Sequence, residues 1–289
     1  MAAAVQTRAS EVSGGNEFAF TDHDFRQIAA MLYADSGISL PETKSTLVYS
    51  RLAKRLRALG LESFRQYCEL ISGPDGTDER HHMLVALTTN VTRFFREPHH
   101  FDHLRENVLP PAIEAAKRGG RLRLWSAGCS TGQEPYSIAL TLLSVLPNAG
   151  DYDIRILASD IDPSVIATAR RGIYSESEVA SIPADLRRRF LEPAGDGRGL
   201  SIGDDARALV AFRELNLIGS WPMKHAFQAI FCRNVVIYFD DETQQKTWRR
   251  FQEHLAPGGQ LYVGHSERVG VTGFVSSGLT SYQFTGQPR

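Results

Sequence analysis

Apolar residues in the first third of the chain recur at the three- and four-residue spacing of amphipathic helices. Thr21 and Asp24 have the spacing of a helix-capping box, and Gly37 stands where that helix would end. The same periodicity predicts a second helix over residues 47–60 and a third over residues 64–71. This pattern indicates a small helical bundle.

The pattern changes after a double-glycine break at residues 119–120, where short apolar runs alternate with helical segments. It predicts strands at RLRLW, YDIRILASD, AFQAIFCRNVVIYF and QLYVGHSE. Alternating strands and helices are typical of a parallel sheet in an α/β domain. Between about residues 181 and 215, four glycines and short β-prone pieces such as GLSI and ALVAF interrupt the alternation. We expect an inserted β-hairpin or small antiparallel sheet there.

These patterns predict an α/β protein with an all-α domain in front of it. We expect a loose tail over residues 1–20, the helical domain over 21–95, a helical linker over 96–120 and the α/β domain over 121–289. A length of 289 residues agrees with two domains, since one domain averages roughly 150.

Composition excludes several classes of protein. Hydrophobic residues make up 42% of the chain and charged residues 22%, as in folded globular proteins. The 32 basic and 33 acidic residues leave a net charge of −1, so we expect no nucleic-acid partner. Cys68, Cys129 and Cys232 are too scattered for a disulfide framework or a CxxC metal site, which favours a cytoplasmic location. The longest apolar-dominated run, residues 137–146, is shorter than the ~18 residues of a membrane span, so we expect no membrane insertion.

The strand RLRLW runs into a glycine-rich segment, SAGCSTG, that precedes a helix. A strand, a tight turn and a helix in this order allow a nucleotide-like ligand to approach bare backbone. Residues Gly128 to Gly132 also match G-x-S-x-G, the nucleophile turn of α/β-hydrolases, with Ser130 as nucleophile. The loop alone leaves both enzyme classes open.

Asp160 favours the nucleotide-like ligand. It ends the next predicted strand, where a carboxylate can accept hydrogen bonds from both hydroxyls of a ribose. A hydrolase would need a base, for which His265 is available, and an oxyanion loop, but no HGGG-like segment precedes the turn. A serine hydrolase therefore remains the rival enzyme.

Six segments together resemble one family, the bacterial chemotaxis receptor glutamate O-methyltransferases, which use S-adenosylmethionine. In chain order they are LTTNVTRFFREPHHF, WSAGCSTGQEPYSIA, ASDID, LNL, FCRNVVIYFD and LAPGGQLYVGHSE. The resemblance covers about residues 21–284 and implies a Rossmann-like, doubly wound methyltransferase sheet. The chain departs from the family at Cys129, where a small residue is usual, and at Gln133, where Glu is frequent. The implied activity is methyl transfer from S-adenosylmethionine to receptor glutamates, giving methyl esters and S-adenosylhomocysteine.

The resemblance also implies which residues form the site. Arg96 and Tyr238 would orient the substrate carboxylate as the catalytic pair. The implied cofactor-binding residues are Asn90, Thr92, Arg96, Gly128, Gly132, Glu134, Asp160, Asn216, Leu217, Arg233 and Asn234. Among them, Glu134 would hold the amino-acid end of the cofactor and Asp160 its ribose. A non-catalytic S-adenosylmethionine-binding signalling module, the rival from another class, would need neither Arg96 nor Tyr238.

The helix over residues 47–60 would present a basic face to the acidic helices of a receptor. A basic face is usually only solvated, but the resemblance favours docking by opposite charge. The residues are Arg51, Lys54, Arg55 and Arg57. The expected partners are the cytoplasmic domain of chemotaxis receptors and, at the insert over 181–215, a receptor C-terminal peptide added as a strand. We expect no metal, since His99, His100 and His103 lack an HExxH context. We also expect the protein to be a monomer.

Overall fold

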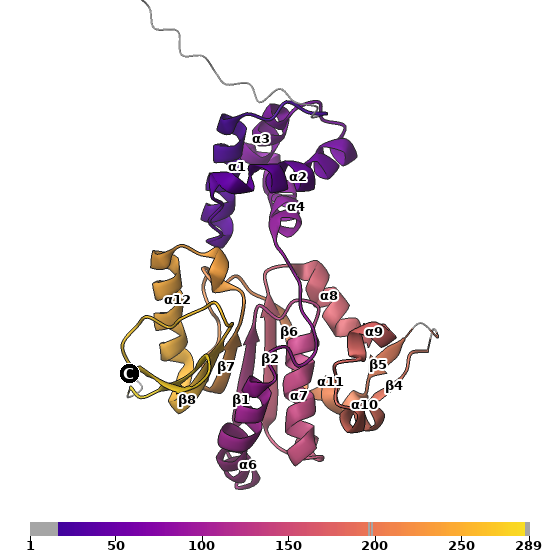
Figure 1. Ribbon diagram of the computed structural model, residues 1–289, viewed down its shortest axis with the longest axis vertical. Coiled ribbons are helices and arrows are strands. Elements are labelled where there is room, and N and C mark those ends of the chain that lie inside the picture. Colours follow the sequence, from indigo (N-terminus) through magenta and orange to yellow (C-terminus); the bar gives the residue numbers. More distant parts are fainter. Residues whose placement is uncertain (1–16, 196, 198, 287–289) are drawn as a thin grey trace, which may run out of the picture. The chain divides into compact units, whose positions relative to one another are not determined.

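The computed structural model describes residues 17–195, 197 and 199–286, and the chain divides into two compact units, residues 1–89 and 90–289 (Figure 1). The tail expected over residues 1–20 lies almost wholly outside the described residues. The boundary between the units comes earlier than the expected one at residue 95, because the chain is bonded to the second unit from Asn90 onward. The Asn90 carbonyl accepts a hydrogen bond from Ser130 Oγ at 2.9 Å.

Within its described residues, the first unit is a bundle of four α-helices. They are α1 (Asp22–Ser36), α2 (Ser45–Leu59), α3 (Phe64–Ser72) and α4 (Thr77–Leu87), with 3-10 turns at Glu42–Lys44 and Pro74–Gly76. The capping box of Thr21 and Asp24 is present, and Gly37 ends α1 with a φ of 75°, a conformation that favours glycine. The fully buried core side chains are Ile28, Leu32, Val48, Leu52, Leu56, Phe64, Tyr67, Ile71 and Met83.

Helix α4 is not evident from hydrophobic spacing, because its buried face includes a carboxylate. Met83 and Leu87 are buried near its end, and Glu79 is buried in its first turn. Glu79 accepts hydrogen bonds from Tyr67 Oη at 3.0 Å and from the Arg55 guanidinium. A count of apolar positions therefore misses this helix.

The second unit is built around a seven-stranded sheet with the order β6-β2-β1-β7-β8-β10-β9. Its parallel strands are β1 (Leu122–Ala127), β2 (Ile154–Asp160), β6 (Val210–Glu214), β7 (Phe227–Cys232) and β8 (Leu255–Val263). Antiparallel strands β9 (Phe274–Gly278) and β10 (Ser281–Phe284) complete one edge. The expected parallel sheet is confirmed, and the carboxyl ends of its parallel strands lie at one edge.

Helices cover both faces of the sheet, because successive side chains of a strand point to opposite faces. On β1, Leu124 joins the core cluster that includes residues of α6 (Leu109–Lys117) and α7 (Gln133–Val145). The next residue, Trp125, packs against Phe251 of α12 (Asp241–His254). The remaining helical elements outside the insert are α5 (His99–His103), the π-helical turn Leu104–Val108, α8 (Pro163–Arg171), α11 (Asp204–Leu209), and 3-10 turns at Ala149–Asp151 and Val236–Tyr238.

The region after α8 contains a small antiparallel sheet, as expected, but its limits differ from the expected 181–215. Its strands are β3 (Ile173–Tyr174), β4 (Leu191–Pro193) and β5 (Leu200–Ile202), in the order β3-β5-β4, with helices α9 (Glu176–Val179) and α10 (Ala184–Phe190). The segment ALVAF does not belong to it, because Val210–Glu214 form β6 and pair in parallel with β2. Here β6 covers an edge of β2 that would otherwise expose unpaired backbone groups.

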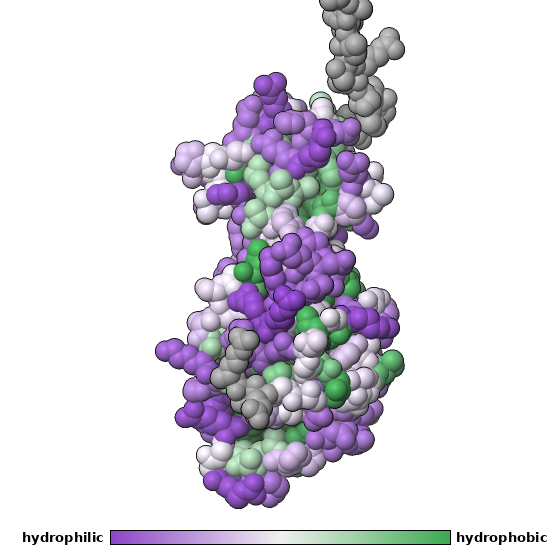
Figure 2. Space-filling model, turned by 90° about the vertical axis from the view of Figure 1, so that its left-hand side faces the viewer, coloured by the Kyte–Doolittle hydropathy of each residue, from purple (hydrophilic) through white to green (hydrophobic). Residues whose placement is uncertain are grey.

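None of the helices in the described part of the chain is both long and apolar enough to cross a membrane. On the face shown in Figure 2, hydrophobic residues form small separate areas among hydrophilic ones. The large apolar side chains are mostly in the cores of the two units.

Candidate active site

The loop that follows β1 is a tight turn, and two of its positions can be occupied only by glycine. Gly128 and Gly132 have φ values of 85° and 100°. A Cβ on Gly128 would lie 2.3 Å from Val235 Cγ2, and one on Gly132 would lie 2.6 Å from Tyr174 Oη. The loop therefore keeps bare backbone at the carboxyl edge of the sheet, where α7 begins.

Asp160, the last residue of β2, lies directly against this loop. Its Oδ2 accepts the Ser130 N–H at 2.8 Å, and its Oδ1 accepts the Asp162 N–H at 3.1 Å. Burial raises the pKa of Asp160, and these backbone N–H groups partly offset that effect. Each carboxylate oxygen has two lone pairs, so Asp160 retains acceptor capacity for the hydroxyls of a ligand.

Ser130 is not placed as a hydrolase nucleophile. Its Oγ donates to the Asn90 carbonyl, which cannot act as a base, and the residue is only 8% exposed. The possible base His265 instead contacts Glu97, with Nδ1 and Oε1 3.4 Å apart. Burial also raises the pKa of the neighbouring Cys129 thiol well above its usual range, so Cys129 is a packing residue.

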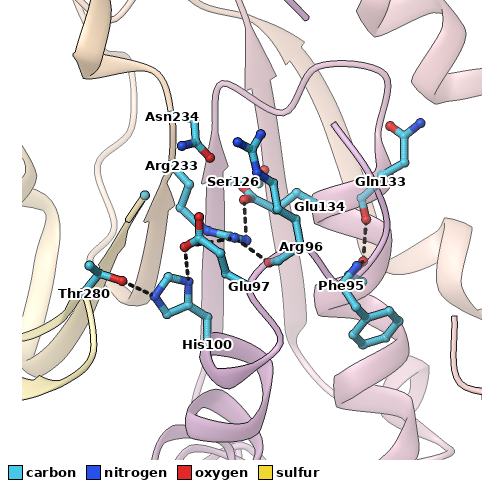
Figure 3. Close-up of polar contacts among 12 residues, drawn as sticks. Phe95, Arg96, Glu97, His100, Ser126, Gln133, Glu134, Arg233, Asn234 and Thr280 are labelled. Atoms are coloured by element: carbon cyan, nitrogen blue, oxygen red, sulfur yellow. Dashed lines mark hydrogen bonds and ion pairs between the residues drawn. The ribbon is translucent and has the colours of Figure 1, made fainter. Parts of the chain in front are cut away.

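Arg233 and Glu134 form a buried ion pair beside the loop (Figure 3). Arg233 Nη1 donates to Glu134 Oε2 at 3.2 Å, and Ser126 Oγ donates to Glu134 Oε1 at 2.7 Å. Burial raises the pKa of Glu134, whereas the Arg233 charge lowers it. Arg233 Nη2 also donates to the Arg96 carbonyl and lies 3.4 Å from Glu97 Oε2. Arg233 thus joins β7, α7 and the segment before α5.

The segment from Asn90 to Arg96 crosses the same edge of the sheet. Asn90 Nδ2 donates to Asp162 Oδ2 at 3.1 Å, and the Phe95 N–H donates to Ser137 Oγ at 2.9 Å. Arg96 is half-buried, and its Nη1 donates to the Val91 carbonyl at 3.1 Å. Thr92 is also half-buried in this segment. The segment is therefore anchored at one end to the loop and Asp162 and at the other end to α7.

Asn216 and Leu217 follow β6 at the same edge, where the Leu215 N–H donates to the Asp160 carbonyl at 2.9 Å. Asn216 Oδ1 accepts the Ile218 N–H at 3.1 Å. Arg250, from α12, donates to the carbonyls of Leu217 at 2.7 Å and Gly219 at 2.6 Å.

The turn after β7 carries Asn234 and Tyr238. Asn234 has a φ of 58°, and its side-chain oxygen is buried without a hydrogen-bond partner. Tyr238 is 37% exposed. Glu267 accepts backbone N–H groups of this turn.

Glu97, Arg250 and Glu267 were not singled out from the sequence, although each supports a predicted site residue. Glu97 and Glu267 lie within the quoted family segments, but neither has a spacing that reveals a role. Each joins loops that are far apart in the chain, so their roles become visible only in three dimensions.

The basic residues of α2 are largely engaged within the first unit. Arg51 Nη1 donates to the carbonyls of Leu87 at 2.9 Å and Thr88 at 2.7 Å, at the end of α4. Arg55 pairs with Glu79, and Arg57 pairs with Glu17. Lys54, by contrast, is exposed.

One group of described residues could bring three ligand atoms together for a metal ion, namely Glu97, His99 and His100, whose atoms lie within 4.8 Å of one another. The Arg233 guanidinium, 3.4 Å from Glu97 Oε2, opposes a cation at this place. His100 is fully buried, and burial together with the Arg233 charge lowers its pKa to about 2. His103 is not in this group, since its Nδ1 contacts Tyr262 Oη at 2.9 Å.

Comparison with known proteins divides the chain much as the structure does. Residues 90–280 match the family model described as CheR methyltransferase, SAM binding domain. Residues 23–88 match CheR methyltransferase, all-alpha domain.

Relatives extend this likeness over most of the chain. A probable chemotaxis protein methyltransferase of Rhizobium etli is 53% identical over 260 residues, covering 88% of this chain and 97% of that protein. Chemotaxis protein methyltransferase 2 of Pseudomonas aeruginosa is 44% identical, covering 89% of this chain and 91% of that protein. The chemotaxis protein methyltransferase of Escherichia coli is 43% identical, covering 86% and 85% respectively.

These matches confirm the family resemblance, the fold class and S-adenosylmethionine as the cofactor, and they do not support a serine hydrolase or a non-catalytic module. The chain belongs to the CheR family of S-adenosylmethionine-dependent methyltransferases.

Proposed function

We propose that this methyltransferase transfers the methyl group of S-adenosylmethionine to glutamate side chains of chemotaxis receptors, giving glutamate methyl esters and S-adenosylhomocysteine. One observation carries the proposal. The loop over residues 128–132 follows β1, Asp160 is the last residue of β2, and the turn over residues 233–238 follows β7. These three parallel strands are adjacent, in the order β2-β1-β7. These groups therefore share the carboxyl edge of the sheet, where nucleotide-like ligands bind in α/β folds.

The residues at this edge fit the cofactor. Bare backbone at Gly128 and Gly132 permits close approach, and Asp160 can still accept hydrogen bonds from ribose hydroxyls. The unpartnered, buried Oδ1 of Asn234 is an acceptor that a ligand donor would satisfy. We assign Asn90, Thr92, Arg96, Glu134, Asn216, Leu217 and Arg233 to the remaining contacts.

The main task of the side chains at this site is to position the methyl donor and the acceptor carboxylate. When bound, S-adenosylmethionine supplies a methyl group on a positively charged sulfur. The acceptor glutamate has an ordinary pKa of about 4.3 and is ionised at neutral pH, so its attack requires no general base. Arg96 would bind the acceptor carboxylate through the guanidinium N–H groups that do not donate to the Val91 carbonyl. Tyr238 would lie beside the methyl group. These groups hold the reacting atoms in line.

Arg96 orients the substrate more than it stabilises the transition state. The sulfonium and the carboxylate combine into neutral products, so charge decreases along the reaction. A strong Arg96–carboxylate bond would stabilise the charged ground state more than the transition state. The half-buried position of Arg96 fits a moderate interaction of this kind.

Binding of S-adenosylhomocysteine by calorimetry tests the cofactor site. Asp160→Ala should weaken binding by at least ten-fold, since each hydrogen bond to a charged group contributes roughly 1.5–3 kcal/mol. Asp185→Ala, which removes an exposed carboxylate in α10, should leave affinity unchanged. Equal affinity of wild type and Asp160→Ala would remove Asp160 from the cofactor site.

The chemical nature of the product tests the reaction. Receptor fragments labelled with a radioactive methyl group should release methanol in mild base, because the label is a glutamate ester. A base-stable label would indicate methylation of nitrogen and would rule out a carboxylate acceptor.

The same proposal extends to partners and location. The basic residues of α2 would dock an acidic receptor helix by opposite charge. The small sheet β3-β5-β4 would add a receptor C-terminal peptide as a further strand. The protein would act as a cytoplasmic monomer without a metal. Co-purification with receptor fragments that have or lack their C-terminal tails separates the two docking modes.

A further inference from the structure

We propose that Glu267 is a positioning residue whose carboxylate sets the turn that presents Asn234 and Tyr238 to the cofactor and substrate. The inference rests on the proposed function, because that function gives Asn234 and Tyr238 their roles. It adds a buried acid that does not itself touch the reacting groups.

The Glu267 carboxylate accepts four backbone N–H groups. Its Oε1 accepts those of Val235 at 3.0 Å and Ile237 at 3.3 Å. Its Oε2 accepts those of Asn234 at 2.9 Å and Gly264 at 2.5 Å. A carboxylate offers about four lone-pair sites, so these four bonds fill them. Glu267 is only 3% exposed, and the bonds are therefore sheltered from water.

The turn needs this acceptor because sheet pairing stops where the turn begins. The last paired residues of β7 and β8 are Cys232 and Val263. Beyond them, the N–H groups of Asn234, Val235 and Ile237 donate to the Glu267 carboxylate and not to a strand, and buried N–H groups require an acceptor. Glu267 therefore continues the link between the two chain segments beyond the end of the sheet.

The same turn packs tightly against its surroundings on both sides. A Cβ on Gly264 would lie 2.5 Å from Asn234 Nδ2, and one on Gly128 would lie 2.3 Å from Val235 Cγ2. A shift of the turn would therefore disturb the cofactor loop as well as Asn234. This contact connects Glu267 to the cofactor loop through Val235.

Only an ionised carboxylate satisfies this arrangement. Burial raises the pKa of Glu267, while the four N–H groups lower it. Protonation would place an O–H among N–H donors, and an amide would place an NH2 group there. Hydrogen bonds to a charged acceptor are also roughly twice as strong as neutral ones. Glu267→Gln therefore changes the bonding of the turn with almost no change in side-chain volume.

The test compares Glu267→Gln with a destabilised variant that leaves the turn intact. Leu143→Ala truncates a core side chain that is only 1% exposed. Leu143 lies near the C-terminal end of α7, whereas Glu134 lies in its first turn. Both variants are measured well below their melting temperatures. We expect Glu267→Gln to raise the Kd for S-adenosylhomocysteine at least ten-fold and to lower kcat at saturating cofactor. Leu143→Ala should change neither value by more than about two-fold.

Chemical rescue provides a readout that a general packing role would not give. Glu267→Ala leaves the four N–H groups converging on a space the size of a carboxylate, and converging N–H groups bind anions. Added formate should restore at least part of the lost affinity, whereas chloride at the same ionic strength should not. Wild-type affinity in Glu267→Gln, or equal losses in Glu267→Gln and Leu143→Ala, would overturn the positioning role.

Hydrogen exchange of the wild-type protein keeps the inference testable if the variants do not fold. The amides of Asn234, Val235 and Ile237 should be as strongly protected without cofactor as the neighbouring amides of β7. Fast exchange at these three amides would contradict the inference. If wild type itself fails to bind S-adenosylhomocysteine, the proposed function fails. Protection of the three amides would in that case still support the hydrogen bonds from the turn to Glu267.

Discussion

Arg233 in the second unit and Arg57 in the first both pair with a carboxylate, but in opposite surroundings. The side chains of Arg233 and Glu134 are 2% and 12% exposed, whereas those of Arg57 and Glu17 are 54% and 50% exposed. The buried arginine also contacts Glu97 and the Arg96 carbonyl. The exposed arginine has no carboxylate partner other than Glu17 among the described residues.

The difference separates two uses of charge in one protein. A buried ion pair contributes little net stability, yet removing one partner leaves an uncompensated charge. The contacts of Arg233 therefore fix positions at the site. An exposed ion pair is weak and is screened by salt, so in the proposed docking Arg57 would exchange Glu17 for an acidic receptor helix. In that proposal the first unit uses charge to meet the receptor, whereas the buried charges of the second unit hold the site in place.

The largest expected effect follows from removing the buried arginine. Arg233→Met leaves Glu134 and Glu97 without their guanidinium, and we expect a loss of about 3–5 kcal/mol in the free energy of unfolding. Urea denaturation measures this loss. Arg57→Met, the matched change at the surface, should leave the unfolding midpoint nearly unchanged. Similar midpoints for the two variants would remove the contrast between the pairs.

The next effect concerns His100, which lies in the buried network with Glu97 and Arg233. Its pKa is lowered to about 2 by burial and by Arg233, whereas an unfolded histidine titrates near 6.5. A depressed pKa gives stability that is complete above about pH 6.5 and is lost as pH falls, because the unfolded chain then takes up the proton. Between pH 7 and pH 5 this loss amounts to about 2 kcal/mol.

Stability measured against pH checks this sign. His100→Gln should reduce the loss between pH 7 and pH 5 by about that amount, although a slope from His103 remains, since burial lowers its pKa too. The exposed residue His23 serves as control, and His23→Gln should keep the wild-type slope. An unchanged slope in His100→Gln would mean that the pKa of His100 is not lowered in the folded protein.

Much of this fold could be predicted from the sequence, because periodicity reports burial. The helices that give α1, α2 and α3 and the alternation that gives the parallel sheet were predicted in this way. The spacing failed for α4, whose inner face includes the paired Glu79, and for β6, which was assigned to the insert. Both errors arise because a short segment's pattern does not reveal its tertiary partner.

The candidate site was predicted less completely. Gly128, Gly132 and Asp160 could be inferred from strand and loop order, whereas the other residues came from the family resemblance. The supporting contacts of Glu267 and Arg250 could not be inferred, because they depend on side chains reaching backbone groups of distant loops. The contact of Arg51 with the Thr88 carbonyl and the ion pair of Arg55 with Glu79 also cannot be inferred from the spacing of basic residues along a helix.

A smaller effect is expected at Arg250, which clamps the loop after Asn216. Its guanidinium donates to the carbonyls of Leu217 and Gly219 and lies 3.9 Å from the centre of the Trp221 ring. Arg250→Lys keeps the charge but loses the two-donor fork, so we expect about 1 kcal/mol weaker binding of S-adenosylhomocysteine. Calorimetry measures the affinity, and Trp221 fluorescence should change with the substitution. Arg249→Lys on the same helix is the control and should retain wild-type affinity.

Substitution of Lys54 should have the smallest effect on stability, and it is the clearest test of whether α2 attracts the receptor by charge. It is exposed on α2, and no ion pair holds it among the described residues, whereas reversing Arg51 or Arg55 would also break contacts with α4. Lys54→Glu should therefore leave the unfolding midpoint unchanged and lower receptor methylation a few-fold at low salt, through KM rather than kcat. The difference from wild type should shrink as salt rises, because exposed charges are screened over about 8 Å at physiological ionic strength. Arg26→Glu makes the same charge change on α1 and should keep more of the wild-type rate. If Lys54→Glu and Arg26→Glu lose rate equally, the effect follows from net charge, and the basic face of α2 does not dock the receptor.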